Sequence, residues 1–166
     1  MLKNEIENIL KANDLNVLRS VLDIRPDYVQ YRNEEKESLL AMAFDMKLSD
    51  EIIEYLIEEL NLSIEDKNVD GISIFDKAVI NGDTTWVKKF VEKGIDPNKS
   101  QRVSRFTPLM EAVTYNRLDI VQFLLEQDVD IYATDTSGYT AKDFARKMRK
   151  TKVLELFKRY ERLGMI

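Results

Sequence analysis

The chain has 166 residues, of which 33% are charged and 44% apolar, and its formal net charge is −5. A chain of this length can bury one continuous core, and these fractions are typical of a folded, soluble protein. Cysteine and histidine are absent, which excludes disulfides, zinc–thiolate and iron–sulfur sites, thiol nucleophiles and imidazole catalysis. No apolar run approaches the roughly 20 residues of a membrane span, and the N-terminus lacks an export leader, so we expect a cytoplasmic protein.

Charge is unevenly distributed along the chain. Residues 1–66 hold 7 basic and 16 acidic side chains, residues 67–140 hold 9 and 11, and residues 141–166 hold 9 and 3. Solvated helix faces of different sign explain most of this asymmetry, although such a field could also orient a partner. The basic C-terminal residues are not interleaved with stacking aromatic residues, so nucleic-acid binding is not expected.

The chain repeats itself with a period of 33–35 residues. Each unit predicts a short helix, a tight turn and a second helix, and the units begin near Asn4, Ser38, Ser73, Thr107 and Thr140. In the second helices apolar residues recur at i, i+1, i+4 and i+5, which makes one wide apolar face. In chain order these pairs are Val17/Leu18 and Val21/Leu22, Ile52/Ile53 and Leu56/Ile57, Trp86/Val87 and Phe90/Val91, Ile120/Val121 and Leu124/Leu125, and Val153/Leu154 with Phe157.

Polar and small residues mark the turns of these units. Thr107 is a good helix N-cap, because its hydroxyl can satisfy a free amide, and Pro108 follows at the first helical position, where its missing donor costs nothing. Gly71 and Gly138 lie just before two other caps, where a hairpin turn needs positive φ. No G-x-G-x-x-G or Walker pattern is present, so no phosphate-binding loop is predicted.

The fourth unit carries the most specific motif. The run from Thr107 to Ala112, TPLMEA, resembles the T-P-L-H-x-A signature of the ankyrin-repeat family, and Ile120–Leu125 resembles the family's second helix. The resemblance covers nearly the whole chain and implies an all-α solenoid of stacked helix–turn–helix units joined by hairpin fingers. A single domain, 1–166, would then contain repeats at about 1–33, 34–68, 69–102, 103–135 and 136–166, with the terminal units acting as caps.

The departures from the family pattern give further expectations. The signature histidine is replaced by Ala41, Asp76, Met110 and Asp143, so we expect its hydrogen bond to the capping residue to be lost. Asp128 stands where Gly94 stands one repeat earlier, which predicts a slightly strained left-handed turn. The second repeat carries an extra residue near 48–50, and the loop 98–106 carries another.

The resemblance implies a non-enzymatic protein–protein interaction module. In that family a partner protein binds the concave face, which the hairpin fingers and first helices form, and no catalytic residue, metal or cofactor is expected. The oligomeric state stays open, with a monomer expected. An apolar, aromatic-rich strip is predicted on this face, although Met46 and Ile80 could instead pack inward. The candidate partner-binding residues are Met46, Ile72, Ile80, Asn81, Val103, Phe106, Thr114, Tyr115, Tyr139 and Met148.

Two smaller groups of residues and the single tryptophan have simpler interpretations. Lys99, Arg102 and Arg105 are predicted to form a solvated loop, or to contact an acidic patch on a partner. Asp128, Asp130 and Asp135 lack the glycine and terminal glutamate of a calcium loop, and Asp130 is interpreted as a turn residue. Trp86 is predicted in the core, because its register places it among the apolar pairs.

Three alternatives remain at this point. The acidic first two repeats favour a small inhibitor, immunity or chaperone-like accessory protein that masks a basic target protein. An enzyme based on carboxylates is a second possibility, for which no convergent pair is found. A designed consensus protein is the third, and the irregular repeat lengths argue against it.

Overall fold

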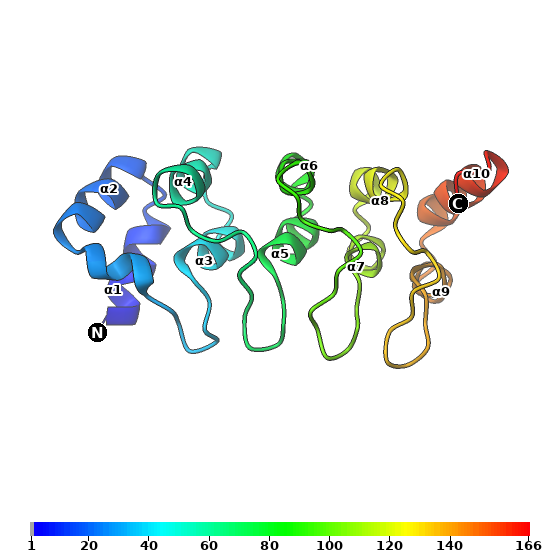
Figure 1. Cartoon of the computed structure of the whole chain (residues 1–166), viewed down its shortest axis with the longest axis horizontal. Coiled ribbons are helices and arrows are strands. Elements are labelled where there is room, and N and C mark those ends of the chain that lie inside the picture. Colours follow the sequence, from blue (N-terminus) through cyan, green and yellow to red (C-terminus); the bar gives the residue numbers. More distant parts are fainter. Residues whose placement is uncertain (1) are drawn as a thin grey trace. The chain divides into compact units, whose positions relative to one another are not determined.

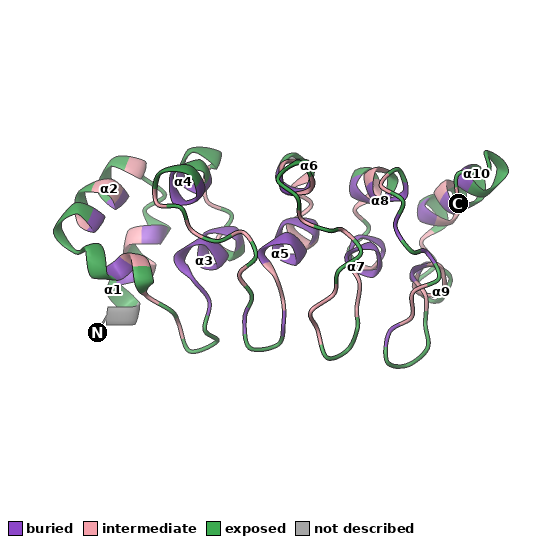
Figure 2. Cartoon of the chain, in the orientation of Figure 1, coloured by how far each residue is buried: buried purple, intermediate pink, exposed green. Residues whose placement is uncertain are grey.

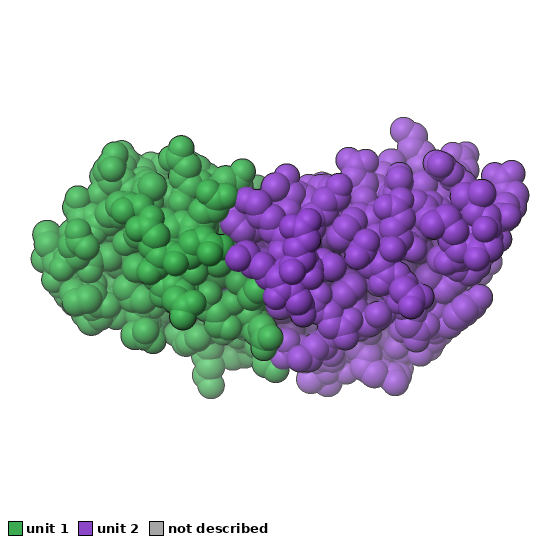
Figure 3. All heavy atoms as spheres, turned by 45° about the horizontal axis from the view of Figure 1, so that its top comes forward, with its two compact units in different colours: residues 1–69 green, residues 70–166 purple. Residues whose placement is uncertain are grey.

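The computed structural model describes residues 2–166, and the chain divides into two compact units, Met1–Val69 and Asp70–Ile166 (Figure 3). Within the described residues all regular elements are helical, and they alternate as the predicted repeats require. None of the helices between residues 2 and 166 combines the length and the apolar character needed to cross a membrane.

The first unit contains two helix pairs. Its elements in chain order are α1 (Leu2–Lys11), α2 (Leu15–Ile24), the short 3₁₀ helix η1 (Pro26–Gln30), α3 (Leu39–Asp45), α4 (Asp50–Glu54) and the π-helical turn η2 (Tyr55–Glu59) (Figure 1). Asn4 lies inside α1 and does not precede it, so the first repeat begins differently from the others. The carboxylate of Asp14 accepts bonds from the amides of Asn16 and Val17 and begins α2.

The second repeat is longer than the fourth because residues are inserted at two places. One is the predicted insertion: the N-cap Ser49 lies six positions after Ala43, whereas the N-cap Arg117 lies five positions after Ala112. The other was not predicted, and it is the π-helical turn, in which the amide of Leu60 donates to the carbonyl of Tyr55 five residues earlier. Both insertions leave the apolar pairs of this helix buried.

The second unit contains three helix pairs. They are α5 (Ile74–Asn81) with α6 (Thr84–Glu92), α7 (Pro108–Thr114) with α8 (Leu118–Leu125), and α9 (Ala141–Lys147) with α10 (Thr151–Arg162). In this unit the first helices form one row, the second helices form another, and the loops that precede α7 and α9 hang beyond the first row (Figure 1). Burial is concentrated where the helices face each other, while the loop tips are largely exposed (Figure 2).

The core of the second unit follows the predicted apolar pairs. Ala78, Ala112 and Ala145 are completely buried, as expected where neighbouring helices approach closely. Trp86 is only 1% exposed and packs against Phe90, with ring centroids 5.6 Å apart, which confirms its interpretation as a core residue. Burying large apolar side chains of this kind stabilises a fold by about 1.5–3 kcal/mol each.

The predicted caps are confirmed, but the expected loss of the histidine hydrogen bond is wrong in two repeats. Ser73 and Thr140 each accept a bond from the third amide of their helix. Asp76 and Asp143 occupy the histidine position and accept bonds from the amide and hydroxyl of these caps, which completes two capping boxes. A carboxylate therefore replaces the imidazole in two repeats, whereas Met110 offers only a sulfur atom, 3.4 Å from the amide of Thr107.

The loops before the first helices depend on left-handed residues. Gly71 and Gly138 have φ of 78° and 82°, as predicted for hairpin turns, while Arg105 adopts φ of 55° at the equivalent place. Asp128 also lies in the left-handed region, with φ of 54°, where Gly94 has 98°. Asp128 therefore adopts a left-handed backbone conformation that favours glycine, as expected for a slightly strained turn.

Candidate functional site: the loop and first-helix face of the second unit

The predicted binding residues of the second unit occupy repeated positions on its loops and first helices. Three rows run across the repeats: Ile72, Phe106 and Tyr139 just before the caps, Ile80, Thr114 and Lys147 near the helix ends, and Asn81, Tyr115 and Met148 one residue later. Their exposure differs along each row. Ile72, Ile80, Asn81, Phe106 and Thr114 are half-buried, whereas Val103, Tyr115, Tyr139 and Met148 are exposed.

An aromatic cluster joins the last two repeats of this face. The ring of Phe106 lies 5.1 Å from that of Phe144, and Phe144 lies 6.0 Å from Tyr139, both in edge-to-face geometry. Such pairs contribute roughly 0.5–1.5 kcal/mol beyond the area that they bury. We define the aromatic cluster as Phe106, Tyr139 and Phe144. The repeat pattern predicts Phe106 and Tyr139 on this face, whereas Phe144 is not predicted there.

Two cations flank the aromatic cluster. The Lys147 ammonium lies 3.2 Å from the centre of the Tyr139 ring, and the Arg102 guanidinium lies 6.0 Å from that of Phe106. These are cation–π contacts, and they place positive charge directly beside aromatic surface. The spacing of Lys147 behind Thr140 repeats that of Thr114 behind Thr107, so the sequence places Lys147 in this row.

Arg102 contradicts its interpretation as a solvated loop residue. Its side chain is only 14% exposed, it forms an ion pair with Glu111, and its Nε lies 3.8 Å from a carboxylate oxygen of Asp76. The acidic partners that sequence analysis expected on another protein are thus supplied by this chain. The reason is that the Arg102 side chain reaches carboxylates on both α5 and α7, which local sequence could not reveal.

This ion cluster of Asp76, Arg102 and Glu111 is deeply buried. Asp76 and Glu111 are each 2% exposed. Burial raises the pKa of Glu111 to about 7, although the charge of Arg102 opposes the shift. Burial likewise raises the pKa of Asp76, against the bonds that it receives from Ser73. These contacts tie the loop before α7 to α5 and α7.

The loops before α7 and α9 are bonded to each other. The amide of Thr136 donates to the carbonyl of Ser104 at 2.9 Å, and the guanidinium of Arg105 donates to the carbonyl of Asp135 at 3.3 Å. The Asp135 carboxylate in turn accepts the amides of Ser137 and Tyr139. These bonds hold Tyr139 in a defined position on the second loop.

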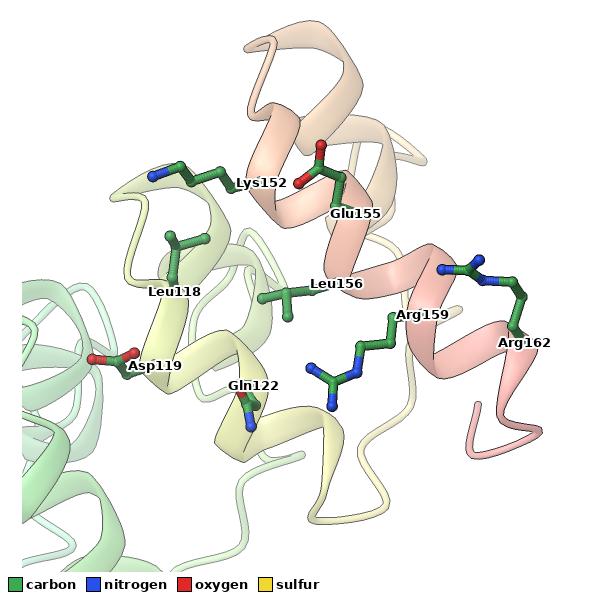
Figure 4. Close-up of a pocket in the computed structure, with 8 residues that line it drawn as sticks. All are labelled: Leu118, Asp119, Gln122, Lys152, Glu155, Leu156, Arg159 and Arg162. Carbon is green, nitrogen blue, oxygen red and sulfur yellow. The ribbon is translucent and has the colours of Figure 1, made fainter.

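A groove lies on the opposite helices of the second unit, between α8 and α10. Its volume is about 600 Å³. Leu156 points from α10 toward α8, and Arg159 extends beside Gln122 (Figure 4). The lining combines acidic, basic and apolar side chains without a repeated pattern: Leu118, Asp119, Gln122, Lys152, Glu155, Leu156, Arg159 and Arg162. This mixture offers no single ligand chemistry.

Met46 is the one predicted binding residue in the first unit. It is half-buried and serves as the C-cap of α3. The loop before α3 exposes Glu34 and Glu35 beside the basic residues Arg32 and Lys36. Glu37 of the same loop is buried and accepts a bond from the side-chain amide of Asn33.

Comparison with known proteins identifies the family. The family model for ankyrin repeats in three copies matches residues 39–135, which is more than half of the chain. The chain belongs to the ankyrin-repeat family. The predicted all-α repeat fold is confirmed by this match and by the helix pairs described above.

Two relatives of this ankyrin-repeat chain illustrate its similarity to larger proteins. It is 37% identical over 76 residues to ankyrin repeat and SAM domain-containing protein 6 of Rattus norvegicus, an alignment that covers 46% of this chain and 9% of the relative. It is 39% identical over 64 residues to 2-5A-dependent ribonuclease of Mus musculus, covering 39% of this chain and 9% of the relative. The chain thus matches about a tenth of the length of these curated relatives.

Ankyrin repeats indicate a protein–protein interaction module, and the family is generally non-enzymatic, although one relative is named as a ribonuclease. Among residues 2–166, no three acidic side chains converge in a way that could hold a metal ion. Asp130 is confirmed as a turn residue, because its carboxylate accepts the amide of Tyr132.

Proposed function

We propose that this chain is a non-enzymatic module that binds a partner protein through the loop and first-helix face of its second unit. The observation that carries the proposal is the grouping of exposed Tyr115, Tyr139 and Met148 at repeated positions of neighbouring first helices and loops. Tyrosine and methionine are enriched where protein interfaces are buried. Each of these residues is between 37% and 47% exposed, so aromatic and apolar surface is available here for a partner to cover.

The rigidity of the face supports the same function. The aromatic cluster, the buried ion cluster and the bonded loops fix the face before any partner arrives. A surface that is ordered in advance loses little conformational entropy on binding.

The test is capture of partners from the native cell extract by the full chain, with wild type beside Tyr115→Ala/Tyr139→Ala. We expect a partner that binds wild type and is lost with the double variant, because truncating a central interface aromatic costs more than about 1 kcal/mol. Tyr132→Ala is the matched control, since Tyr132 is exposed on the α8–α9 loop but outside the three rows. Capture that survives the double variant would place the binding surface elsewhere.

The first unit supports a second candidate function, in which the chain masks a basic target protein. Residues 1–69 hold 8 basic and 16 acidic side chains, a net charge of −8, and Glu34 and Glu35 are exposed on the loop before α3. An inhibitor, immunity or chaperone-like accessory protein would use such a surface. Binding that weakens steeply with added salt and with Glu34→Lys/Glu35→Lys, but not with Tyr115→Ala, would favour this function.

A further inference from the structure

Two segments of the second unit, residues 98–115 and 133–149, contain the aromatic cluster and carry unbalanced charge. Together they hold seven basic and three acidic side chains. The three acids are engaged within the chain: Glu111 pairs with Arg102, Asp135 accepts two backbone amides, and Asp143 accepts the amide and hydroxyl of its cap. Glu111 and Asp135 are buried, whereas the Asp143 side chain is 35% exposed.

The basic residues of the same segments are mostly left at the surface. Arg102 is half-buried and pairs with Glu111, and Lys142 pairs with Glu161. The five others are exposed: Lys99, Arg105, Arg146, Lys147 and Arg149. Of these, Arg146 also reaches Asp143 at 3.1 Å, yet 60% of its side chain remains exposed. The surface around the aromatic cluster is therefore positive, although the whole chain is acidic.

Apolar side chains share this surface with the cations. Val103 is 91% exposed at the tip of the loop before α7, and Met148 ends α9 one residue after Lys147. The Lys147 ammonium rests on the Tyr139 ring, so a carboxylate that pairs with Lys147 brings its own neighbours against an aromatic face. The surface thus offers adjacent binding positions for a negatively charged group and for an apolar side chain of a partner.

We infer that the partner bound here is an acidic protein segment in which Asp or Glu residues flank an aromatic or aliphatic anchor. The inference rests on the proposed function and specifies its partner by charge complementarity. Carboxylates would pair with the exposed cations, while the anchor would contact Tyr115, Tyr139 and Met148. A nucleic acid would match the charge but would leave the aliphatic side chains of Val103 and Met148 uncovered.

The experiment is a selection of random 16-residue peptides, displayed on phage, against the full chain. We expect selected peptides rich in Asp and Glu next to aromatic or aliphatic residues. The Kd of a synthesised, fluorescein-labelled peptide, measured by anisotropy, should rise about tenfold or more with Lys147→Glu. Lys158→Glu is the matched control, because Lys158 is exposed on α10, outside both segments, and the Kd should change less than about twofold.

The outcomes separate this inference from the proposed function. Peptides that lose binding with Tyr115→Ala/Tyr139→Ala but are not acidic would overturn the inference and leave the proposed function standing. Peptides that bind all variants equally, or no enriched peptide, would overturn both. Displacement of the peptide by a single-stranded oligonucleotide, or dimerisation of the chain that Lys147→Glu abolishes, would assign the surface to a different occupant and overturn the inference.

Discussion

Glu111 is a carboxylate whose environment works against its charge. It lies on α7 and is almost fully buried, and Arg102 of the loop before α7 supplies its counter-charge. Asp76 and Lys77 are also buried nearby, and each is engaged in the chain. A buried ion cluster of this kind contributes less to stability than its short contacts suggest, because desolvation offsets much of the attraction.

The raised pKa of Glu111 predicts a stability that falls with rising pH. Its pKa is about 7 in the folded chain against an ordinary 4.5, so between these values the folded state holds a proton that the unfolded state has released. Stability is therefore greatest at the acidic end of this window and is lost as pH rises through it. We expect the free energy of unfolding of the second unit to drop by roughly 2 kcal/mol between about pH 5 and pH 8.

Urea unfolding followed by the fluorescence of Trp86, which lies in this unit, measures this change. Glu111→Gln should flatten the pH dependence, whereas Glu155→Gln, at an exposed position on α10, should keep the wild-type slope. Equal slopes in wild type and Glu111→Gln would show that this carboxylate is ionised throughout the range.

The hairpin loops of the second unit differ in how tightly they pack, although their backbones are alike. Gly71 and Gly138 have nearly the same φ, 78° and 82°. A Cβ at Gly71 would lie 2.3 Å from the carbonyl oxygen of Gln101, whereas a Cβ at Gly138 would meet nothing within 4 Å. Gly138 is needed only because its backbone is left-handed. Gly71 is needed for the same reason and also because a Cβ there would collide with the backbone of Gln101.

This difference predicts unequal effects of the same substitution. Gly138→Ala should cost about 1 kcal/mol of unfolding free energy from the left-handed backbone alone. Gly71→Ala should cost at least about 1 kcal/mol more, because the backbone of the next loop must move away. Urea unfolding of both variants measures the difference, and equal losses would contradict the close packing at Gly71.

The elements that local chemistry controls could be predicted from sequence. Each helix pair, the caps and the glycine turns follow from apolar spacing and from Ser, Thr and Gly at fixed offsets. The π-helical turn at Tyr55–Glu59 could not be predicted, since its extra residue leaves the apolar pairs unchanged. The ion cluster likewise depends on contacts of Arg102 with carboxylates on two different helices, so sequence located the aromatic strip but not the ion cluster.

At the scale of the whole molecule, the two units carry net charges of opposite sign. The first unit has a net charge of −8, whereas residues 70–166 hold 17 basic and 14 acidic side chains. Asp66 of this unit pairs with Arg32 at 2.9 Å, yet acidic side chains outnumber basic ones by eight. Repulsion within this excess of negative charge opposes folding of the unit, and salt screens such repulsion.

Added salt should therefore protect the first unit more than the second. Raising NaCl from about 20 mM to about 500 mM should slow amide exchange in α3 more than in α7, since the Debye length falls below the typical spacing of surface charges. Hydrogen exchange followed by mass spectrometry resolves the two helices within the intact chain. Glu35→Lys/Glu65→Lys changes the net charge of the first unit from −8 to −4 at two exposed positions, and it should reduce the salt effect on α3 without altering α7. An equal response of both helices to salt would instead assign the effect to stronger apolar burial, which acts on the two units alike.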